Sequence, residues 1–174
     1  MHRFLGLVVL AAFAVWGAFA ADDVASAVAG TVKAVDKGTK TAVVKTADGT
    51  EHTFHFVGRT VGHGSEAAGK DAFDGMKEGD QVVVHYTVKG SEKTAEEVDH
   101  VGKDGLKMSV VAVKSVDRGA KTVTVKTAEG GEETYKLTDQ AAHETGKAMK
   151  KGAKWTIYYT EEGGKKVGHF FKAS

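Results

Sequence analysis

Two histidines stand out in the segment "EHTFHF", residues 51–56, which otherwise has the composition of a β-strand. Neutral imidazole is a good ligand for Zn(II), Ni(II) and Cu(II), so His52 and His55 are candidate metal ligands. Successive side chains of a strand point to opposite faces, which places His52 with Phe54 and turns His55 the other way. One ion therefore cannot readily bind both histidines, and a site here needs a partner from another strand.

His100 and His85 are the partners that the sequence offers. If the strand of His100 meets the strand of His52 or His55 where a small barrel closes, two imidazoles and either Glu51 or Asp99 would hold Cu, Zn or Ni. The alternative interpretation is that these histidines are ordinary strand residues, because a lone histidine is weak evidence for a metal. Both interpretations stay open, and no other cofactor is indicated.

Catalytic chemistry is not indicated. The chain has no cysteine and no Gly-x-Ser-x-Gly motif, which removes the usual nucleophile arrangements. Adjacent carboxylates such as Glu96 and Glu97 split between the two faces of a strand or project into solvent, so they do not look like an acid–base pair. We therefore predict that the protein is not an enzyme and has no catalytic residues.

The chain contains two copies of one sequence unit. The segment "VKAVDKGTKTAVVKTADGTEHTF" returns as "VKSVDRGAKTVTVKTAEGGEETY", and "MKEGDQVVVHYT" returns as "MKKGAKWTIYYT", in the same order. This alignment places Glu133 where the first copy has His52, and Lys136 where it has His55. Self-similarity in a fixed order predicts a tandem duplication into two similar domains.

Each copy reads as a small β-barrel. Short segments rich in valine, threonine and aromatic residues are bounded by glycine-containing turns, which is typical of antiparallel strands. In the first copy we expect strands over residues 30–36, 41–47, 51–57, 80–88 and 94–101. Alanine-rich segments at 65–76 and 139–152 predict one short helix per repeat. Five strands with a helix after the third predict an all-β fold of two tandem, five-stranded OB-like barrels, with an SH3-like barrel or a small sandwich as the alternative.

Strand alternation also predicts the residues that fill the two barrels. The expected core residues of the first copy are Val32, Val35, Val44, Phe54, Phe56, Val82, Val84 and Tyr86. Those of the second copy are Val113, Val116, Val123, Val125, Tyr135, Leu137, Trp155, Ile157 and Tyr159.

Residues 1–20 are expected to be a signal peptide, because Arg3 precedes an apolar run that ends at "AFA", a small-x-small cleavage pattern. We place the first repeat at 21–104 and the second at 105–174, in a protein that is periplasmic or secreted and has no stable membrane insertion after cleavage. Without Arg3 the mature chain is formally neutral. Neutrality argues against a nucleic acid as partner, because its phosphates attract clustered positive charge.

The frame "GTVKAVD", followed by "TAVVKTADGTEHTFHF" and "MKEGDQVVVHYT", resembles small exported bacterial β-barrel domains. Those include a secreted family of unknown function, often tandem, and more distantly the periplasmic copper and silver chaperones of metal-efflux systems. The resemblance implies an OB-like fold. The chaperones bind metal on strand three with methionines, a histidine and a tryptophan, whereas the matching strand here offers His52 and His55 and no methionine. The ligands that select Cu(I) are therefore not retained.

The sequence as a whole predicts a non-enzymatic exported binding or structural module, whose partner is an unidentified protein or small ligand. The alternative is a periplasmic divalent transition-metal binding protein that uses His52, His55, His85 and His100, not all in one site.

Overall fold

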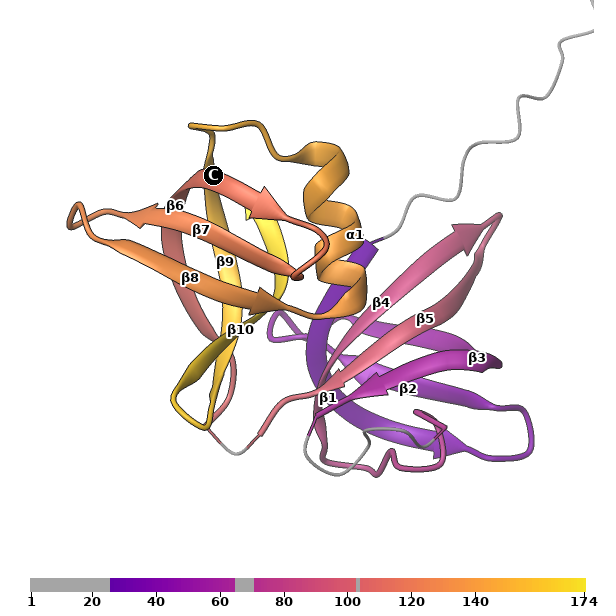
Figure 1. The fold of residues 1–174 in the computed structure, drawn as a ribbon. Helices are drawn as coiled ribbons and strands as arrows, with labels where there is room; N and C mark the ends of the chain where they lie inside the picture. The colour runs from indigo at the N-terminus through magenta and orange to yellow at the C-terminus, as the bar shows by residue number, and fades with distance from the viewer. Residues whose placement is uncertain (1–25, 65–70, 103) are drawn as a thin grey trace, which may run out of the picture.

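Two closed five-stranded barrels follow one another along the chain (Figure 1). The computed structural model describes residues 26–64, 71–102 and 104–174, and the expected leader, residues 1–20, lies outside them. Neighbouring strands follow the order β1-β2-β3-β5-β4 in the first barrel and, read from β6, the order β6-β7-β8-β10-β9 in the second. The predicted all-β, OB-like fold is confirmed.

The first barrel follows the predicted strands with one informative difference. Its strands are β1 (Ser26–Asp36), β2 (Thr41–Lys45), β3 (Glu51–His63), β4 (Gln81–Lys89) and β5 (Glu92–His100). The prediction that the third strand ends at residue 57 is wrong, because β3 continues to His63 beyond an irregularity in its ladder with β5 between Phe56 and Val61. The Thr60 hydroxyl bridges this irregularity by donating to the Ala95 carbonyl at 2.8 Å. The extension brings His63 alongside Asp99.

The second barrel contains the helix that the sequence predicted. Its elements are β6 (Lys107–Asp117), β7 (Thr122–Thr127), β8 (Glu132–Leu137), α1 (Asp139–Ala148), β9 (Lys154–Glu162) and β10 (Lys165–Ala173). Among the described residues no helix is both long enough and apolar enough to cross a membrane.

The helix predicted at 65–76 in the first copy is not seen where it is described. Residues 65–70 lie outside the described part, and Asp71 to Met76 form successive turns. The amides of Asp74 and Met76 donate to the carbonyls three residues earlier, while the Asp71 carboxylate accepts the Phe73 amide at 3.0 Å. This side-chain bond competes with helical hydrogen bonding. Phe73 and Met76 are nevertheless buried in the barrel core.

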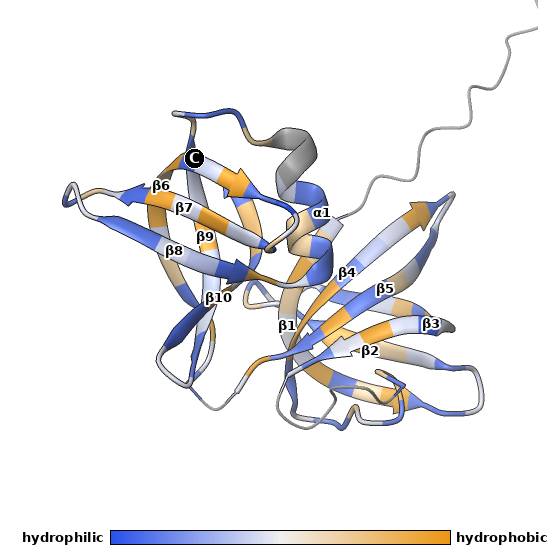
Figure 2. Ribbon diagram, viewed as in Figure 1, coloured by the Kyte–Doolittle hydropathy of each residue, from blue (hydrophilic) through white to orange (hydrophobic). Residues whose placement is uncertain are grey.

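The core predictions are largely confirmed. Figure 2 shows apolar and polar residues alternating along the strands of both barrels. Most of the expected residues are buried in two separate clusters, one in each barrel. Those that are only partly buried and pack against the clusters are Val35, Tyr86, Val116 and Trp155.

A third apolar cluster lies between the barrels and was not predicted. Val83 and Val101 of the first barrel pack with Phe170 of the second, and Leu106 from the connection joins them. Val83 points away from the core that Val82 and Val84 fill, yet it is fully buried. The outer face of β4 is therefore covered by the second barrel, and α1 lies between the two barrels in Figure 1.

Candidate functional site

Polar side chains gather on the outer face of three adjacent strands of the first barrel. In the β3–β5 ladder His63 pairs with Asp99, and in the β4–β5 ladder His85 pairs with Glu97 and Val83 pairs with Asp99. Directly paired residues project from the same side of a sheet. The register therefore places two carboxylates and two imidazoles together, beside the apolar contact that Val83 makes.

These side chains are buried because the second barrel covers them. Glu97 and Asp99 expose 1% and 0% of their surface, and His85 exposes none. His63 lies at the rim, with 32% of its side chain exposed. Charged groups are almost never fully buried unless they are paired or coordinate a metal, so this cluster requires a specific explanation.

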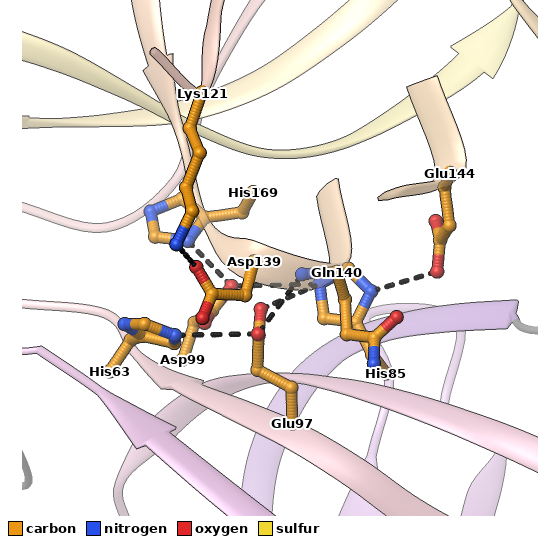
Figure 3. A network of polar contacts seen from close by, with 9 residues as sticks. All are labelled: His63, His85, Glu97, Asp99, Lys121, Asp139, Gln140, Glu144 and His169. Carbon is orange, nitrogen blue, oxygen red and sulfur yellow. Dashed lines mark hydrogen bonds and ion pairs between the residues drawn. The ribbon is translucent and has the colours of Figure 1, made fainter. Parts of the chain in front are cut away.

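The ligand-type atoms of the cluster converge. One atom from each of His63, Glu97 and Asp99 lies within 4.8 Å of the other two. His63 Nε2 is 3.3 Å from Glu97 Oε2. His85 Nε2 is 3.6 Å from Asp99 Oδ2 and 3.9 Å from Glu97 Oε1. Figure 3 shows the four side chains turned toward one another.

The second barrel contributes the N-terminus of α1. The Gln140 backbone amide donates a hydrogen bond of 3.0 Å to Glu97 Oε2. Thr138, the N-cap residue of this helix, makes no side-chain capping bond. Glu97 of the first barrel thus supplies the capping acceptor, and its negative charge is favoured at a helix N-terminus. Asp139, next to Gln140, is paired with Lys121 (Figure 3).

Two further residues of the second barrel contact the cluster. His169 Nδ1 donates a hydrogen bond of 2.8 Å to Asp99 Oδ2, and His169 Nε2 is 2.8 Å from the Thr160 hydroxyl. Glu144 on α1 lies 3.2 Å from His85 Nδ1, which donates to its carboxylate. Three groups from the second barrel therefore orient three groups of the first.

Protonation follows from these contacts. Burial lowers the pKa of His85, but its close contact with Asp99, its hydrogen bond to Glu144 and the negative charges of both carboxylates outweigh burial, so the pKa lies well above its ordinary value. Burial raises the pKa of Asp99, but the hydrogen bond from His169 and the close contact of His85 hold it below its usual range. The interaction with Glu97 raises the pKa of His63. At neutral pH the cluster thus holds imidazolium charge between carboxylates.

Several oxygen and nitrogen atoms of the cluster make no hydrogen bond to the described residues. Four buried atoms of the cluster have no hydrogen-bond partner among the described residues: Glu97 Oε1, Asp99 Oδ1, His85 Nε2 and His63 Nε2. Each native polar group of this kind calls for an explanation, and an ion is one of the recognised explanations. Carboxylate oxygens and imidazole nitrogens are ligands for Zn(II), and imidazole also suits Ni(II) and Cu(II). Two carboxylates would also neutralise the charge of a divalent ion.

Of the four histidines predicted as metal ligands, the structure places only His85 in this cluster. His52 Nδ1 is 2.7 Å from Lys93 Nζ, and the His52 ring stacks on Phe54. His55 is exposed and pairs with Thr94, so the ladder between β3 and β5 does not bring it to His100.

His100 lies near the end of β5, where it pairs with Val82, and its Nδ1 is 4.0 Å from Asp80 Oδ2. The structure therefore does not bring His100 together with His52 or His55. Metal binding by those three histidines stays a prediction.

Sequence reasoning did not identify His63 or Glu97 as ligands, although it named Asp99 as an accompanying carboxylate. Glu96 and Glu97 do alternate between faces, but the face that carries Glu97 is covered by the second barrel rather than by solvent. One signal was available. The uninterrupted apolar run Val82 to Val84 indicates a strand that is buried on both faces.

Comparison with known proteins gives no family. No protein-family model matches the chain, and no curated protein matches it. Similar solved structures include silver-bound CusF, at 18% identity over 44% of this chain and 97% of that one, with a TM-score of 0.34. Apo-CusF from Escherichia coli is 18% identical over 47% of this chain and 93% of that one, with a TM-score of 0.35. A mutant of the single-stranded DNA binding protein from Thermus aquaticus is 10% identical over 86% of this chain and 93% of that one, with a TM-score of 0.23. Similarity this low does not bear on what the chain binds.

Proposed function

We propose that this chain is a non-enzymatic protein that binds one divalent transition-metal ion at the junction of its two barrels. Glu97, Asp99 and His63 are the proposed ligands, with His85 as the fourth. The observation that carries the proposal is the convergence of ligand atoms of the first three within 4.8 Å of one another, in a cluster where one atom of each makes no hydrogen bond among the described residues.

The spacing of these atoms suits an ion after small side-chain rotations. Ligands of a tetrahedral zinc ion lie about 2.0–2.2 Å from the metal, so neighbouring ligand atoms are about 3.4 Å apart. His85 Nε2 and Glu97 Oε1 are 3.9 Å apart, and His63 Nε2 lies 3.3 Å from the other oxygen of Glu97, Oε2. The ligand set contains no sulfur, which favours Zn(II), Ni(II) or Cu(II) over Cu(I).

Metal and protons compete for this site. In the metal-free protein burial lowers the pKa of His85, but its contacts with Asp99 and Glu144 and their negative charges raise it more, so His85 carries a proton. A metal ion must displace the proton from His85 Nε2 before this nitrogen can bind it. Affinity therefore rises with pH, as it does for metal sites in general.

The proposal retains the sequence-based predictions that the structure leaves untested. These are a leader at residues 1–20, two repeats at 21–104 and 105–174 that arose by duplication, a place among the tandem exported barrel domains, and a periplasmic or extracellular location. An exported protein meets metal ions outside the cytoplasm, which is consistent with a site made of nitrogen and oxygen ligands alone.

Calorimetric titration of the mature protein with Zn(II), Ni(II) and Cu(II) at pH 7.5 tests the proposal. We expect one ion per chain and an affinity at least tenfold weaker in Glu97→Gln and in His63→Ala. His63 lies at the rim, so His63→Ala is the variant that leaves the fold intact. His55→Ala is the matched control, because this histidine is exposed on the same strand.

Two results would overturn the proposal. The first is the absence of binding tighter than about 100 μM, where the binding free energy is only about 5.5 kcal/mol. The second is binding that His63→Ala leaves unchanged and His55→Ala or His52→Ala abolishes, which would restore the site first suggested by the sequence.

A further inference from the structure

The second barrel provides the hydrogen bonds that orient the buried ligands of the first. We infer that the metal site and the junction between the barrels form one cooperative unit, in which a bound ion holds the barrels docked and undocking weakens metal binding. This inference rests on the proposed function and adds its regulation.

Each buried carboxylate has one oxygen that accepts a hydrogen bond from the second barrel and one that accepts none among the described residues. Glu97 accepts the Gln140 amide with Oε2, which also lies 3.3 Å from His63 Nε2, and its Oε1 is the oxygen without a hydrogen bond. Asp99 accepts from His169 with Oδ2, which also lies 3.6 Å from His85 Nε2, and its Oδ1 is the oxygen without a hydrogen bond. An ion can therefore take Oε1 and Oδ1 while both contacts to the second barrel remain in place.

His85 is arranged in the same manner. Its Nδ1 donates to Glu144 on α1, and its Nε2 points toward Asp99 without a hydrogen bond. A ligating histidine almost always donates its other ring N–H to a carboxylate or carbonyl, which fixes the tautomer and the ring orientation. Glu144 therefore acts as a positioning residue for His85, and it comes from the opposite barrel.

Separation of the barrels would remove the hydrogen bonds that Gln140, His169 and Glu144 make to the proposed ligands. Glu97 and Asp99 would then lie on an exposed sheet face, hydrated and free to rotate, and no group would fix their orientation. Loss of such outer-shell partners typically lowers metal affinity by about 10- to 100-fold. Coupling between two binding equilibria is reciprocal, so an ion that binds better to docked barrels must also favour docking.

The apolar contact between the barrels allows docking to be altered without touching a ligand. Leu106 packs with Val83, Val101 and Phe170, and none of these four belongs to either barrel core. Leu106→Asp places a charge in this contact. Val88→Asp is the matched control, because Val88 is 38% exposed and lies outside the junction cluster.

The experiment compares zinc affinity and barrel docking in the full mature chain. The chain has no cysteine, so cysteines introduced at the exposed residues Lys89 and Glu129 label one barrel each for distance measurement. We expect zinc to narrow the distribution of distances between the two labels in the protein that carries no further substitution. We expect Leu106→Asp to broaden it and to weaken zinc binding at least tenfold, whereas Val88→Asp stays within twofold.

Glu144→Gln provides a second measurement that does not depend on undocking. The visible absorption spectrum of the Co(II)-loaded protein reports the geometry of the ligands around the ion. Glutamine keeps the volume of Glu144 but removes the carboxylate that accepts from His85 Nδ1, so we expect Glu144→Gln to change this spectrum and to weaken zinc binding at least tenfold. A role for Glu144 in packing alone would leave the spectrum unchanged.

The outcomes separate the two proposals. If the unmodified chain binds no zinc, the proposed function fails and this inference fails with it. If Leu106→Asp separates the barrels yet binds zinc as tightly as the parent, the inference is overturned and the proposed function stands. An unchanged Co(II) spectrum in Glu144→Gln would likewise contradict the positioning role of the second barrel.

Discussion

His169 of the second barrel donates a hydrogen bond of 2.8 Å from Nδ1 to Asp99 Oδ2 of the first, between side chains that are 2% and 0% exposed. The two residues are 70 positions apart in the chain. This buried contact joins the two barrels, and it also orients Asp99, a residue of the candidate metal site. The same carboxylate therefore serves the junction and the proposed metal site.

Asp99→Asn tests the contribution of that carboxylate to stability. The amide keeps the volume but removes the charge that faces His85 and His169, which leaves buried positive charge unpaired. Removal of one partner from a buried ion pair typically costs about 3–5 kcal/mol, and we expect a loss of about 3 kcal/mol. Urea unfolding at pH 7 without metal measures it. Glu92→Gln, exposed at the start of β5, is the control and should stay within about 0.5 kcal/mol.

The raised pKa of His85 predicts a specific pH dependence. A raised pKa in the folded state contributes stability that is complete below the ordinary value of 6.5 and is lost as the pH rises toward the folded value of about 10. The stability difference between the parent protein and His85→Gln should therefore be largest near pH 6 and shrink toward pH 9.5. Thermal unfolding of both proteins without metal measures it. A difference that grows with pH would contradict this assignment of charge.

In the second barrel a lysine lies over two tyrosine rings and pairs with a carboxylate. Lys166 Nζ lies 5.4 Å from the ring centres of both Tyr135 and Tyr159 and 2.7 Å from Glu133 Oε2. The Tyr135 hydroxyl donates to the same carboxylate at 2.7 Å. Glu133→His should therefore destabilise the protein by about 1 kcal/mol, because the lysine and the tyrosine both lose their acceptor. Urea unfolding at pH 7 measures this loss.

The first barrel has the same arrangement with His52 in place of the carboxylate. Lys93 Nζ lies 5.9 Å from the Phe54 ring centre and 5.6 Å from that of Tyr86. Burial and the charge of Lys93 both lower the pKa of His52. His52→Glu should give Lys93 an acidic partner and stabilise the protein by about 0.5 kcal/mol at pH 7, a small gain because the pair is partly exposed. A lower free energy of unfolding in urea for this variant than for the parent would contradict the prediction.

Close approach of the backbone at Gly30 gives a prediction about the fold itself. A Cβ atom at this position would lie 2.4 Å from the Lys45 carbonyl oxygen and 2.8 Å from Val44 Cγ1. Gly30→Ala should therefore destabilise the first barrel by about 2 kcal/mol through overpacking. Gly58→Ala is the control, because nothing lies within 4 Å of its added atom. Equal unfolding midpoints for the two variants would contradict the close approach of Gly30 to Val44 and Lys45.

The barrels could be predicted from the sequence because their determinants are local. Phe54, Val123 and Val125 alternate with polar residues, and this alternation fixes which side of each strand faces the core. The helix of the second copy follows from its composition. In the first copy the described part of the corresponding segment forms turns, because the Asp71 side chain bonds to the Phe73 amide.

The candidate site could not be predicted in the same manner because it depends on how the two barrels dock. Glu97 has the sequence context of an exposed strand residue, and only the second barrel makes it buried. His63 lies beyond the irregularity in the β3–β5 ladder, and the alternation of side chains that predicted β3 does not extend past this irregularity. The remaining signal was the apolar run around Val83, which indicates that something covers the outer face of β4 without identifying it.

The position of a bound ion is the most direct test of the account. Crystals of the mature protein grown with zinc, measured on both sides of the zinc absorption edge, locate the ion by its anomalous scattering. We predict a single strong site within about 2.0–2.3 Å of Glu97 Oε1, Asp99 Oδ1 and His63 Nε2. An ion held by His52 or His55, with the junction cluster paired as it is here, would contradict the account, as would the absence of any site at saturating zinc.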